Sequence, residues 1–221
     1  MTADSPPTGR TPATTPAGHR SADAPPVVGV IGGVGSGKSA VARTLAEAIG
    51  AVLIDGDVVG HETLADPAVA AEVAAAFEDV TDDADAVDRR KLGRVVFADS
   101  AAMDRLEAIL HPRMRRRFVR DIAAARDAGR PVVFDAAVMF EAGWDDLCDV
   151  VAFVDVPEDV REARAVGRGW TADRWRAAEQ SQWPLGRKRD AATFAVSNAD
   201  ADHGASAAAA IADRLQALAG G

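Results

Sequence analysis

The stretch that decides the fold is Gly32-Gly33-Val34-Gly35-Ser36-Gly37-Lys38-Ser39, which matches the pattern G-x-x-x-x-G-K-S. Glycines allow the backbone to wrap with its amide groups turned inward, and a helix that starts behind them adds a favourable dipole for anions. In such a loop the lysine reaches the β- and γ-phosphates of a nucleotide, and the serine hydroxyl ligates Mg²⁺. The competing interpretation is a glycine-rich turn that binds no nucleotide.

The residues on either side of this loop have the periodicity that a phosphate-binding loop requires. Val27-Val28-Gly29-Val30-Ile31 is a short β-branched run typical of a buried strand. Beyond the loop, Val41, Leu45 and Ile49 recur at helical spacing, and Gly50 supplies a stop. The order of strand, glycine loop and helix favours nucleotide binding over a simple turn.

Further apolar runs alternate with helical segments along the rest of the chain. The runs that we predict as strands are 52–54, 131–135, 150–154 and 194–196. Continuous apolar strands that alternate with helices indicate a parallel sheet covered on both faces. We therefore predict an α/β fold of the P-loop NTPase class, with a five-stranded parallel sheet whose core comprises 27–57, 131–160 and 186–221.

The remaining segments are expected to be a helical insertion and a tail. Helical patterns run from Pro67 to Phe77, Arg89 to Phe97, Ala101 to Leu110 and Pro112 to Ala128, and Ala205 to Leu218 reads as a closing helix. We place the insertion at 58–130, with the acidic segment 78–88 as a loop. Residues 1–26 are rich in Ala, Thr, Ser and Pro, so we predict a disordered tail there.

Composition limits the partners of the chain. The 221 residues include 25 basic and 34 acidic ones, and the net charge of −9 opposes attraction to nucleic acid or to an anionic membrane. The local cluster Arg113, Arg115, Arg116 and Arg117 is therefore interpreted as a solvated helix face.

Cys148 is the only cysteine, which rules out an internal disulfide and fits a reducing compartment. With no apolar run of about 18 residues and no apolar signal-peptide centre, we expect a cytoplasmic protein, either a monomer or a weak homo-oligomer.

The nucleotide is predicted to be ATP. Loops of this pattern serve GTPases, ATPases, kinases and motors, so the loop alone does not give the reaction. A guanine-specific GTPase would carry an N-K-x-D motif, whereas the only asparagine of this chain, Asn198, is followed by Ala199-Asp200-Ala201. The absence of this motif argues against guanine specificity.

Five blocks, in the right order and with similar spacing from about Val28 to Leu218, resemble the dephospho-CoA kinase family. The first is the glycine loop, close to the family's G-G-I-G-S-G-K-S, and the second is Ile54-Asp55-Gly56-Asp57, similar to I-D-A-D. The third is Asp88-Arg89-Arg90-Lys91-Leu92 with Val96-Phe97, leading to Leu110-His111-Pro112. The fourth is D-A-A-V-M-F-E from Asp135 to Glu141, and the last is Gln182-Trp183-Pro184-Leu185 with Lys188 and Asn198.

The resemblance implies that the chain uses ATP and magnesium to phosphorylate the ribose 3′-hydroxyl of dephospho-CoA, the last step of coenzyme A biosynthesis. It implies catalytic roles for Lys38 and Asp57, and for Arg164 and Arg168 in a mobile lid at 161–185. Arg161 lies at helical spacing from these two arginines, and we expect it on a solvated basic face.

Two aspartates after the second strand compete for the role of base. The resemblance favours Asp57, although from spacing alone Asp57 is equally well a helix N-cap. Alternation along the chain points Asp55 and Asp57 roughly the same way, so which one acts is open. Asp55 is expected to support substrate or magnesium binding. Asp135, at the end of a strand, either holds magnesium together with Ser39 or is a turn residue.

The substrate side is implied by the resemblance alone. The insertion would bind dephospho-CoA, with Arg89 near its pyrophosphate. His111, Glu141, Asp55 and Asp135 complete the expected substrate-binding set, and Asn198 the expected cofactor-binding one. Without the resemblance, Arg89 reads as surface charge balance and His111 as structural.

The sequence also departs from the family pattern. Ala137 replaces a proline, and Ser197 replaces an aspartate before Asn198. Two other functions share the loop: a nucleoside or nucleotide kinase, and a regulatory module that binds ATP without turnover.

Overall fold

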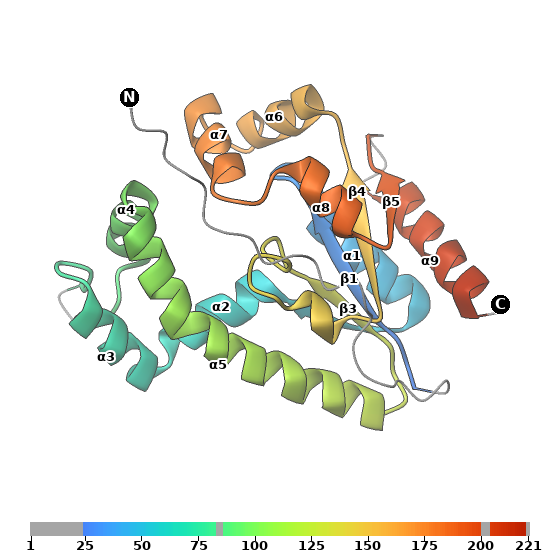
Figure 1. Cartoon of the computed structure of the whole chain (residues 1–221), viewed down its shortest axis with the longest axis horizontal. Coiled ribbons are helices and arrows are strands. Elements are labelled where there is room, and N and C mark those ends of the chain that lie inside the picture. The colour runs from blue at the N-terminus through green and yellow to red at the C-terminus, as the bar shows by residue number, and fades with distance from the viewer. Residues whose placement is uncertain (1–23, 83–85, 200–203, 220–221) are drawn as a thin grey trace.

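The computed structural model describes residues 24–82, 86–199 and 204–219 (Figure 1). Its strands are β1 (Val27–Gly32), β2 (Val52–Asp55), β3 (Val132–Asp135), β4 (Val150–Asp155) and β5 (Phe194–Ser197). Its α-helices are α1 (Lys38–Ile49), α2 (Gly56–Ala65), α3 (Pro67–Ala76), α4 (Arg89–Ala98), α5 (Ser100–Asp127), α6 (Glu158–Val166), α7 (Ala172–Gln180), α8 (Leu185–Ala191) and α9 (Ala205–Ala219). Most of the predicted tail, residues 1–23, lies outside the described residues. Among the described helices, none combines the length and hydropathy needed to cross a bilayer.

The five strands form one parallel sheet in the order β2-β3-β1-β4-β5. β1 lies in the middle, with Val28 opposite Val133 of β3 on one side and Val150 of β4 on the other. All six residues of β1 are buried, as expected for a β-branched run covered on both faces. The predicted five-stranded parallel sheet is confirmed, and it puts the glycine loop at the centre of the carboxyl edge.

Helices cover both faces of the sheet and bury a separate apolar cluster on each. On one face, α1 and α9 pack with side chains such as Leu45 and Ile211. On the other, Phe118 of α5 packs with Phe134 of β3 and with Trp144, at ring-centroid distances of 4.7 and 4.9 Å. The edge of the sheet is thereby held rigidly between two packed layers.

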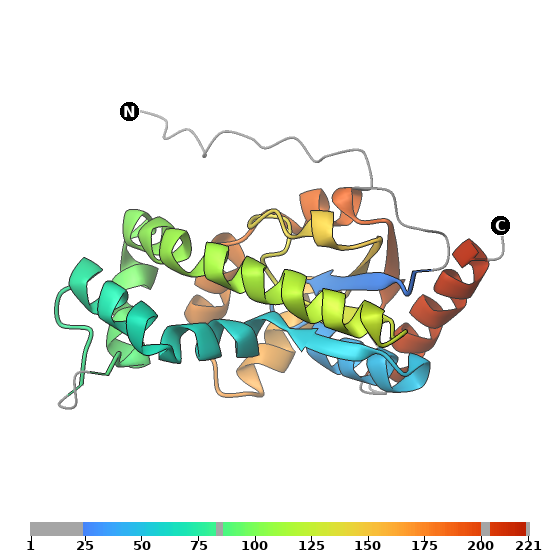
Figure 2. The ribbon, with the colours of Figure 1, turned by 90° about the horizontal axis from the view of Figure 1, so that it is seen from below.

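The helices α2 to α5 form a lobe beside the sheet, and Figure 2 shows α5 running from that lobe along the body of the molecule. The lobe has its own apolar cluster, which includes Val73, Leu92 and Val96. The helix α2 was not predicted. It begins directly after β2 because the Asp55 side chain accepts the amides of Asp57 and Val58 and so caps it.

The predicted break between two helices near His111 is wrong. α5 is continuous from Ser100 to Asp127, with Pro112 inside it. An interior proline removes one helical hydrogen bond and costs about 3 kcal/mol. Ile109 packs into the cluster of the lobe and Met114 into that of the sheet, so the helix is fastened by burial on both sides of the proline.

The arginine cluster on α5 is paired with carboxylates. Arg113 contacts Glu72, Arg115 lies 2.7 Å from Asp146, and Arg117 lies 2.6 Å from Asp121. The pairs of Arg113 and Arg115 tie α5 to its neighbours, that of Arg117 lies within α5, and all three offset positive charge of the cluster.

Candidate active site

The glycine loop, hereafter the phosphate loop, joins the central strand β1 to α1. Gly35 and Gly37 have φ angles of 90° and 81°, in the left-handed region that residues with a side chain rarely adopt. A Cβ on Gly35 would lie 2.3 Å from the backbone oxygen of Arg161, so no side chain fits there. Glycine is therefore required at Gly35 by both the backbone and the packing, and at Gly37 by the backbone.

Several amides of the phosphate loop have no protein acceptor among the described residues. Among the described residues, no hydrogen-bond partner is found for the backbone N–H groups of Gly35, Gly37, Lys38 and Ser39. They lie at the N-terminus of the 12-residue helix α1, whose dipole adds to their attraction for an anion. The loop is thus arranged to bind phosphate oxygens.

The lysine of the loop is paired with a buried carboxylate. Lys38 Nζ lies 2.7 Å from Asp135 Oδ1, and Asp135 is 2% exposed at the end of β3. Strand register sets Asp135 beside Val30 of β1 and Asp55 of β2. Because a buried charge is costly without a partner, this pair holds the Lys38 ammonium at the end of β3.

The oxygens near Lys38 suit Mg²⁺. Ser39 Oγ lies 3.4 Å from Lys38 Nζ, which in turn contacts Asp135. The described residues contain no cluster of three or more His, Cys, Asp or Glu side chains suited to a metal ion. Mg²⁺ usually keeps several waters and binds through one or two carboxylates together with substrate phosphates. A hydroxyl and one carboxylate beside a phosphate site therefore fit magnesium that arrives with a nucleotide.

The two aspartates after β2 have different surroundings. Asp55 is the helix N-cap, because its Oδ1 accepts Asp57 N–H at 2.9 Å, whereas Asp57 is exposed in the first turn of α2. The expected alternation is wrong, since the chain turns helical at Gly56 and the two side chains no longer share a direction. The capping role considered for Asp57 belongs to Asp55. Asp57 takes no part in the cap, and it lies just beyond β2 at the carboxyl edge of the sheet.

Arg161 and Arg164 of α6 and Arg168 just beyond it lie in different environments. Arg161 is 4% exposed, so the expected solvated face is wrong for it. Its guanidinium pairs with Glu179 of α7 beneath the phosphate loop, an acceptor that the spacing on α6 could not reveal. Arg164 donates to the carbonyl of Asn198 at 2.9 Å and of Ser36 at 3.4 Å, whereas Arg168 is exposed beyond the end of α6.

Asn198 is buried behind the phosphate loop. Its Nδ2 donates to the Ser36 carbonyl at 2.7 Å, while its Oδ1 accepts no hydrogen bond from the described residues. The Ser36 hydroxyl, also buried, lacks a partner in the same part of the structure. Asn198 therefore contacts the loop from the end of β5, and its cofactor-binding role stays a prediction.

Glu141 and Lys188 meet in a buried junction between the turn after β3 and the base of the lid. Lys188 Nζ lies 2.8 Å from Glu141 Oε1 and donates to the Ala137 carbonyl and to Gln182 Oε1, each at 2.7 Å. Glu141 Oε1 also accepts Trp183 N–H at 2.8 Å. Burial lowers the pKa of Lys188, and the charge of Glu141 opposes that shift. Lys188 thus holds the turn at Ala137, the position where the sequence lacks the family's proline.

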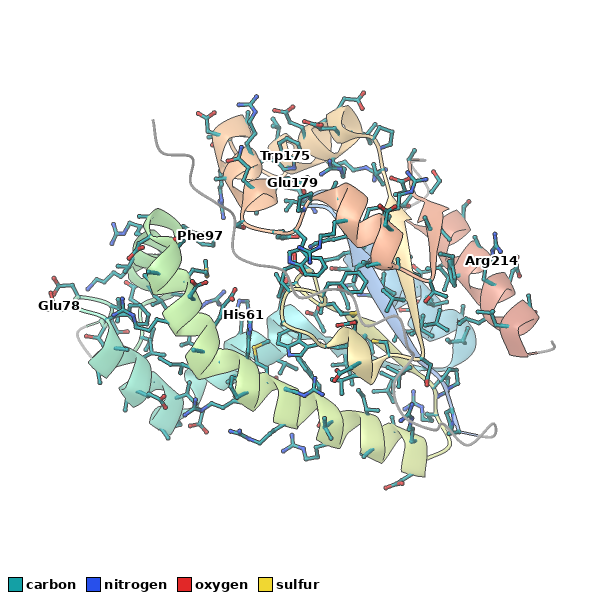
Figure 3. All side chains as sticks on the ribbon, in the orientation of Figure 1. His61, Glu78, Phe97, Trp175, Glu179 and Arg214 are labelled. Atoms are coloured by element: carbon teal, nitrogen blue, oxygen red, sulfur yellow. The ribbon has the colours of Figure 1, made fainter. Side chains whose placement is uncertain are left out.

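Two predicted substrate residues lie on the lobe. Arg89, at the start of α4, contacts His61 of α2, a residue that sequence reasoning missed and that Figure 3 labels. His111 of α5 packs edge-on against Trp144 with ring centroids 4.9 Å apart, and burial lowers its pKa. His111 is therefore set in the layer that joins the lobe to the sheet.

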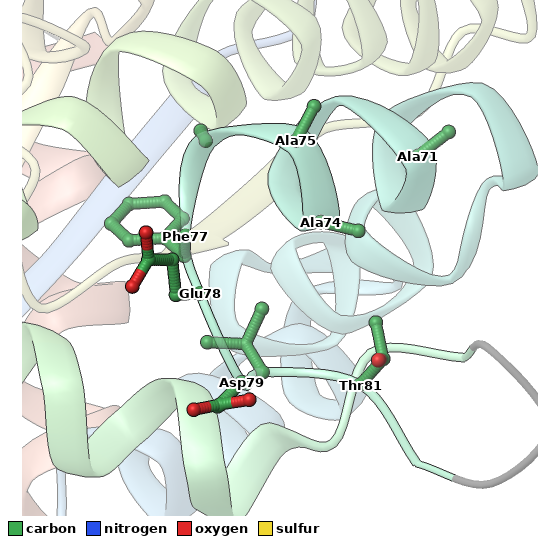
Figure 4. Close-up of a pocket in the computed structure, with 9 residues that line it drawn as sticks. Ala71, Ala74, Ala75, Phe77, Glu78, Asp79 and Thr81 are labelled. Carbon is green, nitrogen blue, oxygen red and sulfur yellow. The ribbon is translucent and has the colours of Figure 1, made fainter.

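A hollow of ≈ 810 Å³ lies on the outer part of the lobe, between α3 and the loop that follows it (Figure 4). Its lining includes alanine methyls, Phe77, Glu78 and Asp79. None of the residues placed around the phosphate loop belongs to it. The chemistry of the site is therefore at the carboxyl edge of the sheet rather than in this hollow.

The phosphate loop also has contacts that no sequence motif predicted. Trp175 and Glu179 of α7 bind the backbone of Val34, and both lie on the side of α7 that faces the sheet (Figure 3). Their only sequence signal is the helical spacing of four, which places them on one face of α7.

Comparison with known proteins agrees with this geometry. A family model described as dephospho-CoA kinase matches residues 26–203. A dephospho-CoA kinase from Rhodopirellula baltica is 37% identical over 179 residues, which make up 78% of this chain and 82% of that protein. A crystal structure from Thermus thermophilus is similar at a TM-score of 0.74 and 29% identity, covering 87% of this chain and 98% of that one. The structure of a Campylobacter jejuni dephospho-CoA kinase shares the fold at a TM-score of 0.63 and 20% identity, with 86% and 96% covered. The chain belongs to the dephospho-CoA kinase family.

Proposed function

We propose that this protein transfers the terminal phosphoryl group of ATP to the ribose 3′-hydroxyl of dephospho-CoA, giving ADP and coenzyme A. Family membership supports the acceptor. The observation that carries the chemistry is the group of open loop amides beside Lys38, held 2.7 Å from Asp135. Phosphoryl transfer asks mainly for in-line positioning and for neutralisation of charge, and this arrangement supplies fixed donors for the phosphates.

Ser39 and Asp135 would hold Mg²⁺. Bound there, the ion would neutralise charge on the β- and γ-phosphates. Lys38 would leave Asp135 when the nucleotide binds. The phosphates would then pair with Lys38, and Mg²⁺ with Asp135. The short side chain of Ser39, at the start of α1, keeps its hydroxyl beside the loop amides.

Asp57 is proposed as the group that accepts the proton of the ribose hydroxyl or orients that hydroxyl. Its exposure, and the engagement of Asp55 as the cap of α2, favour Asp57 over Asp55. Asp55 would support the substrate from beside Asp135. Arg164 and Arg168 would stabilise charge on the moving phosphoryl group from a lid at 161–185, and Asn198 would contribute to nucleotide binding from behind the loop.

The lobe at 58–130 is proposed as the part that binds dephospho-CoA. Arg89 would meet its pyrophosphate, with His61 as an added neighbour of Arg89. His111 and Glu141 would shape the substrate side by fixing the packing between lobe, sheet and lid. The protein is proposed to work in the cytoplasm as a monomer or a weak homo-oligomer.

The test is ADP production by the purified protein with Mg-ATP, with and without dephospho-CoA. Adenosine, AMP, CMP and pantothenate serve as rival acceptors. ADP release that depends on dephospho-CoA, with coenzyme A as product, is the expected result. Turnover with a rival acceptor alone would make the protein a nucleoside or nucleotide kinase. ATP binding without any turnover would make it a regulatory module.

A further inference from the structure

The third residue of the phosphate loop, Val34, has both of its peptide groups bound by side chains of α6 and α7. Its N–H donates to Glu179 Oε1 at 2.6 Å. Its carbonyl accepts the Trp175 indole N–H at 3.0 Å, and Arg161 Nη1 lies 3.5 Å from the same oxygen. The lid therefore grips the backbone of the loop at one residue.

The three gripping side chains also hold one another. Arg161 Nη1 lies 2.5 Å from Glu179 Oε2, and the two side chains are 5% and 17% exposed. Arg161 Nε donates to the Val156 carbonyl at 3.1 Å, and its guanidinium lies over the Trp175 ring, 5.4 Å from the centroid. A nearly buried ion pair is stable only when such additional hydrogen bonds satisfy its remaining atoms. Arg161, Trp175 and Glu179 thus form one unit, hereafter the clasp.

The glycines of the loop fit this clasp closely. A Cβ on Gly33 would lie 2.7 Å from Arg161 Nη1 and 3.0 Å from Glu179 Oε1. Gly33 has an ordinary negative φ, so the backbone does not demand glycine there. The proximity of the clasp supplies the reason for a glycine at this position.

The contacts divide the amides of the loop into two sets. The N–H of Val34 is bound by the clasp, and that of Ser36 donates to the Gly33 carbonyl at 3.0 Å. The open set, described above, is Gly35, Gly37, Lys38 and Ser39. The clasp thus fixes the loop through an amide outside the open set, and leaves the open amides available to an anion.

We propose that Arg161, Trp175 and Glu179 are positioning residues that hold the phosphate loop in its phosphate-binding form. Glu179 acts through Val34 and does not touch the nucleotide. The inference rests on the proposed use of ATP. It also implies that Trp175 and Glu179 of α7 keep their contacts with the loop during the reaction. Any closing movement then belongs to residues between α6 and α7.

The test measures Mg-ATP dissociation constants by calorimetry on the full chain, and KM for ATP and for dephospho-CoA. The main variant is Glu179→Ala. Its control is Glu162→Ala, which removes a lid carboxylate that contacts Arg176 at 3.4 Å and does not reach the loop. We expect Glu179→Ala to weaken Mg-ATP binding by about tenfold or more, the order expected for a hydrogen bond to a charged group. KM for ATP rises in parallel, KM for dephospho-CoA is unchanged, and the control binds as the wild type does.

A second variant keeps the proposal testable if Glu179→Ala fails to fold. Trp175→Phe retains a six-membered aromatic ring but removes the N–H that binds the Val34 carbonyl, together with the rest of the five-membered ring. Because Trp175 is 2% exposed, we expect a lower melting temperature, and a smaller rise in the ATP dissociation constant than in Glu179→Ala. Unchanged or tighter ATP binding in either folded variant overturns the proposal, and tighter binding would mean that Glu179 competes with the nucleotide. Because binding is measured without dephospho-CoA, an error in the proposed acceptor would leave this result intact.

Discussion

The strand-end side and the lid side of the nucleotide site are held by different kinds of contact. On the strand-end side, Asp135 ends β3 and Lys38 begins α1, directly after the loop that follows the neighbouring strand β1, so strand order and a short loop bring them together. On the lid side, Glu179 reaches Val34 across 145 positions in the sequence, through side chains that share no backbone pairing. The strand-end side can be read from motifs, whereas the lid side depends on tertiary packing. We expect substitutions on the strand-end side to lower turnover. Substitutions on the lid side should instead disturb the order of the loop or lower the stability of the protein.

The largest expected effect is on the strand-end side. Asp57→Asn keeps the shape of the side chain but removes its basicity, so kcat should fall by about 10²- to 10⁴-fold, the usual contribution of a positioned base. The Mg-ATP dissociation constant should not change. Steady-state turnover with dephospho-CoA and ATP calorimetry measure the two quantities.

Asp55→Asn is the matched comparison for that experiment. Asparagine caps helices as well as aspartate does, so α2 should keep its start. Turnover that survives in Asp57→Asn and collapses in Asp55→Asn would move the base to Asp55. It would also mean that the helix cap and the base are the same side chain.

The next effect tests the lid side through stability. Lys188→Met leaves the largely buried Glu141 without its cation, and leaves the Gln182 side-chain oxygen and the Ala137 carbonyl without this donor. Removing one partner of a buried ion pair typically costs about 3–5 kcal/mol, so the free energy of unfolding in urea should fall by that order.

The neighbouring residue supplies the control. Arg189→Met removes an ion pair to Asp155 between side chains that are 57% and 39% exposed. Exposed pairs contribute about 0–1 kcal/mol, so this variant should unfold almost as the wild type does. Equal losses in the two variants would contradict a structural role for the Lys188 junction.

The same contrast explains how far the sequence could be read. The β-branched runs and the glycine loop predicted the sheet and the position of Lys38, because those signals are local. The break expected near Pro112 failed, since burial of Ile109 and Met114 on its two sides outweighs a local helix penalty. The α2 helix was missed because its cap, Asp55, was read as part of a catalytic motif.

The candidate site shows the same limit. Arg161 was placed on the surface because spacing on α6 gives its neighbours on that helix but not the carboxylate on α7 that buries it. The pairing of His61 with Arg89 likewise joins two helices that no motif connects. The catalytic and binding roles given to Asp57, Arg164, Arg168 and Asn198 stay predictions, and Asp57→Asn tests the first of them.

The smallest effect concerns His111, which lies where α5 joins the lobe to the sheet and so belongs to neither side. Burial against Trp144 lowers its pKa below the ordinary value of 6.5. As the pH falls below 6.5, the unfolded chain takes up a proton that the folded protein resists, so stability is lost until the pH reaches the lowered pKa. His111→Gln cannot titrate in this range. Melting temperatures compared from about pH 8 to pH 5 should therefore fall more steeply in the wild type than in the variant. A wild type that gains stability over the same range would mean that His111 is held as a cation, with Glu107, one turn earlier on α5, as its nearest candidate partner in the sequence.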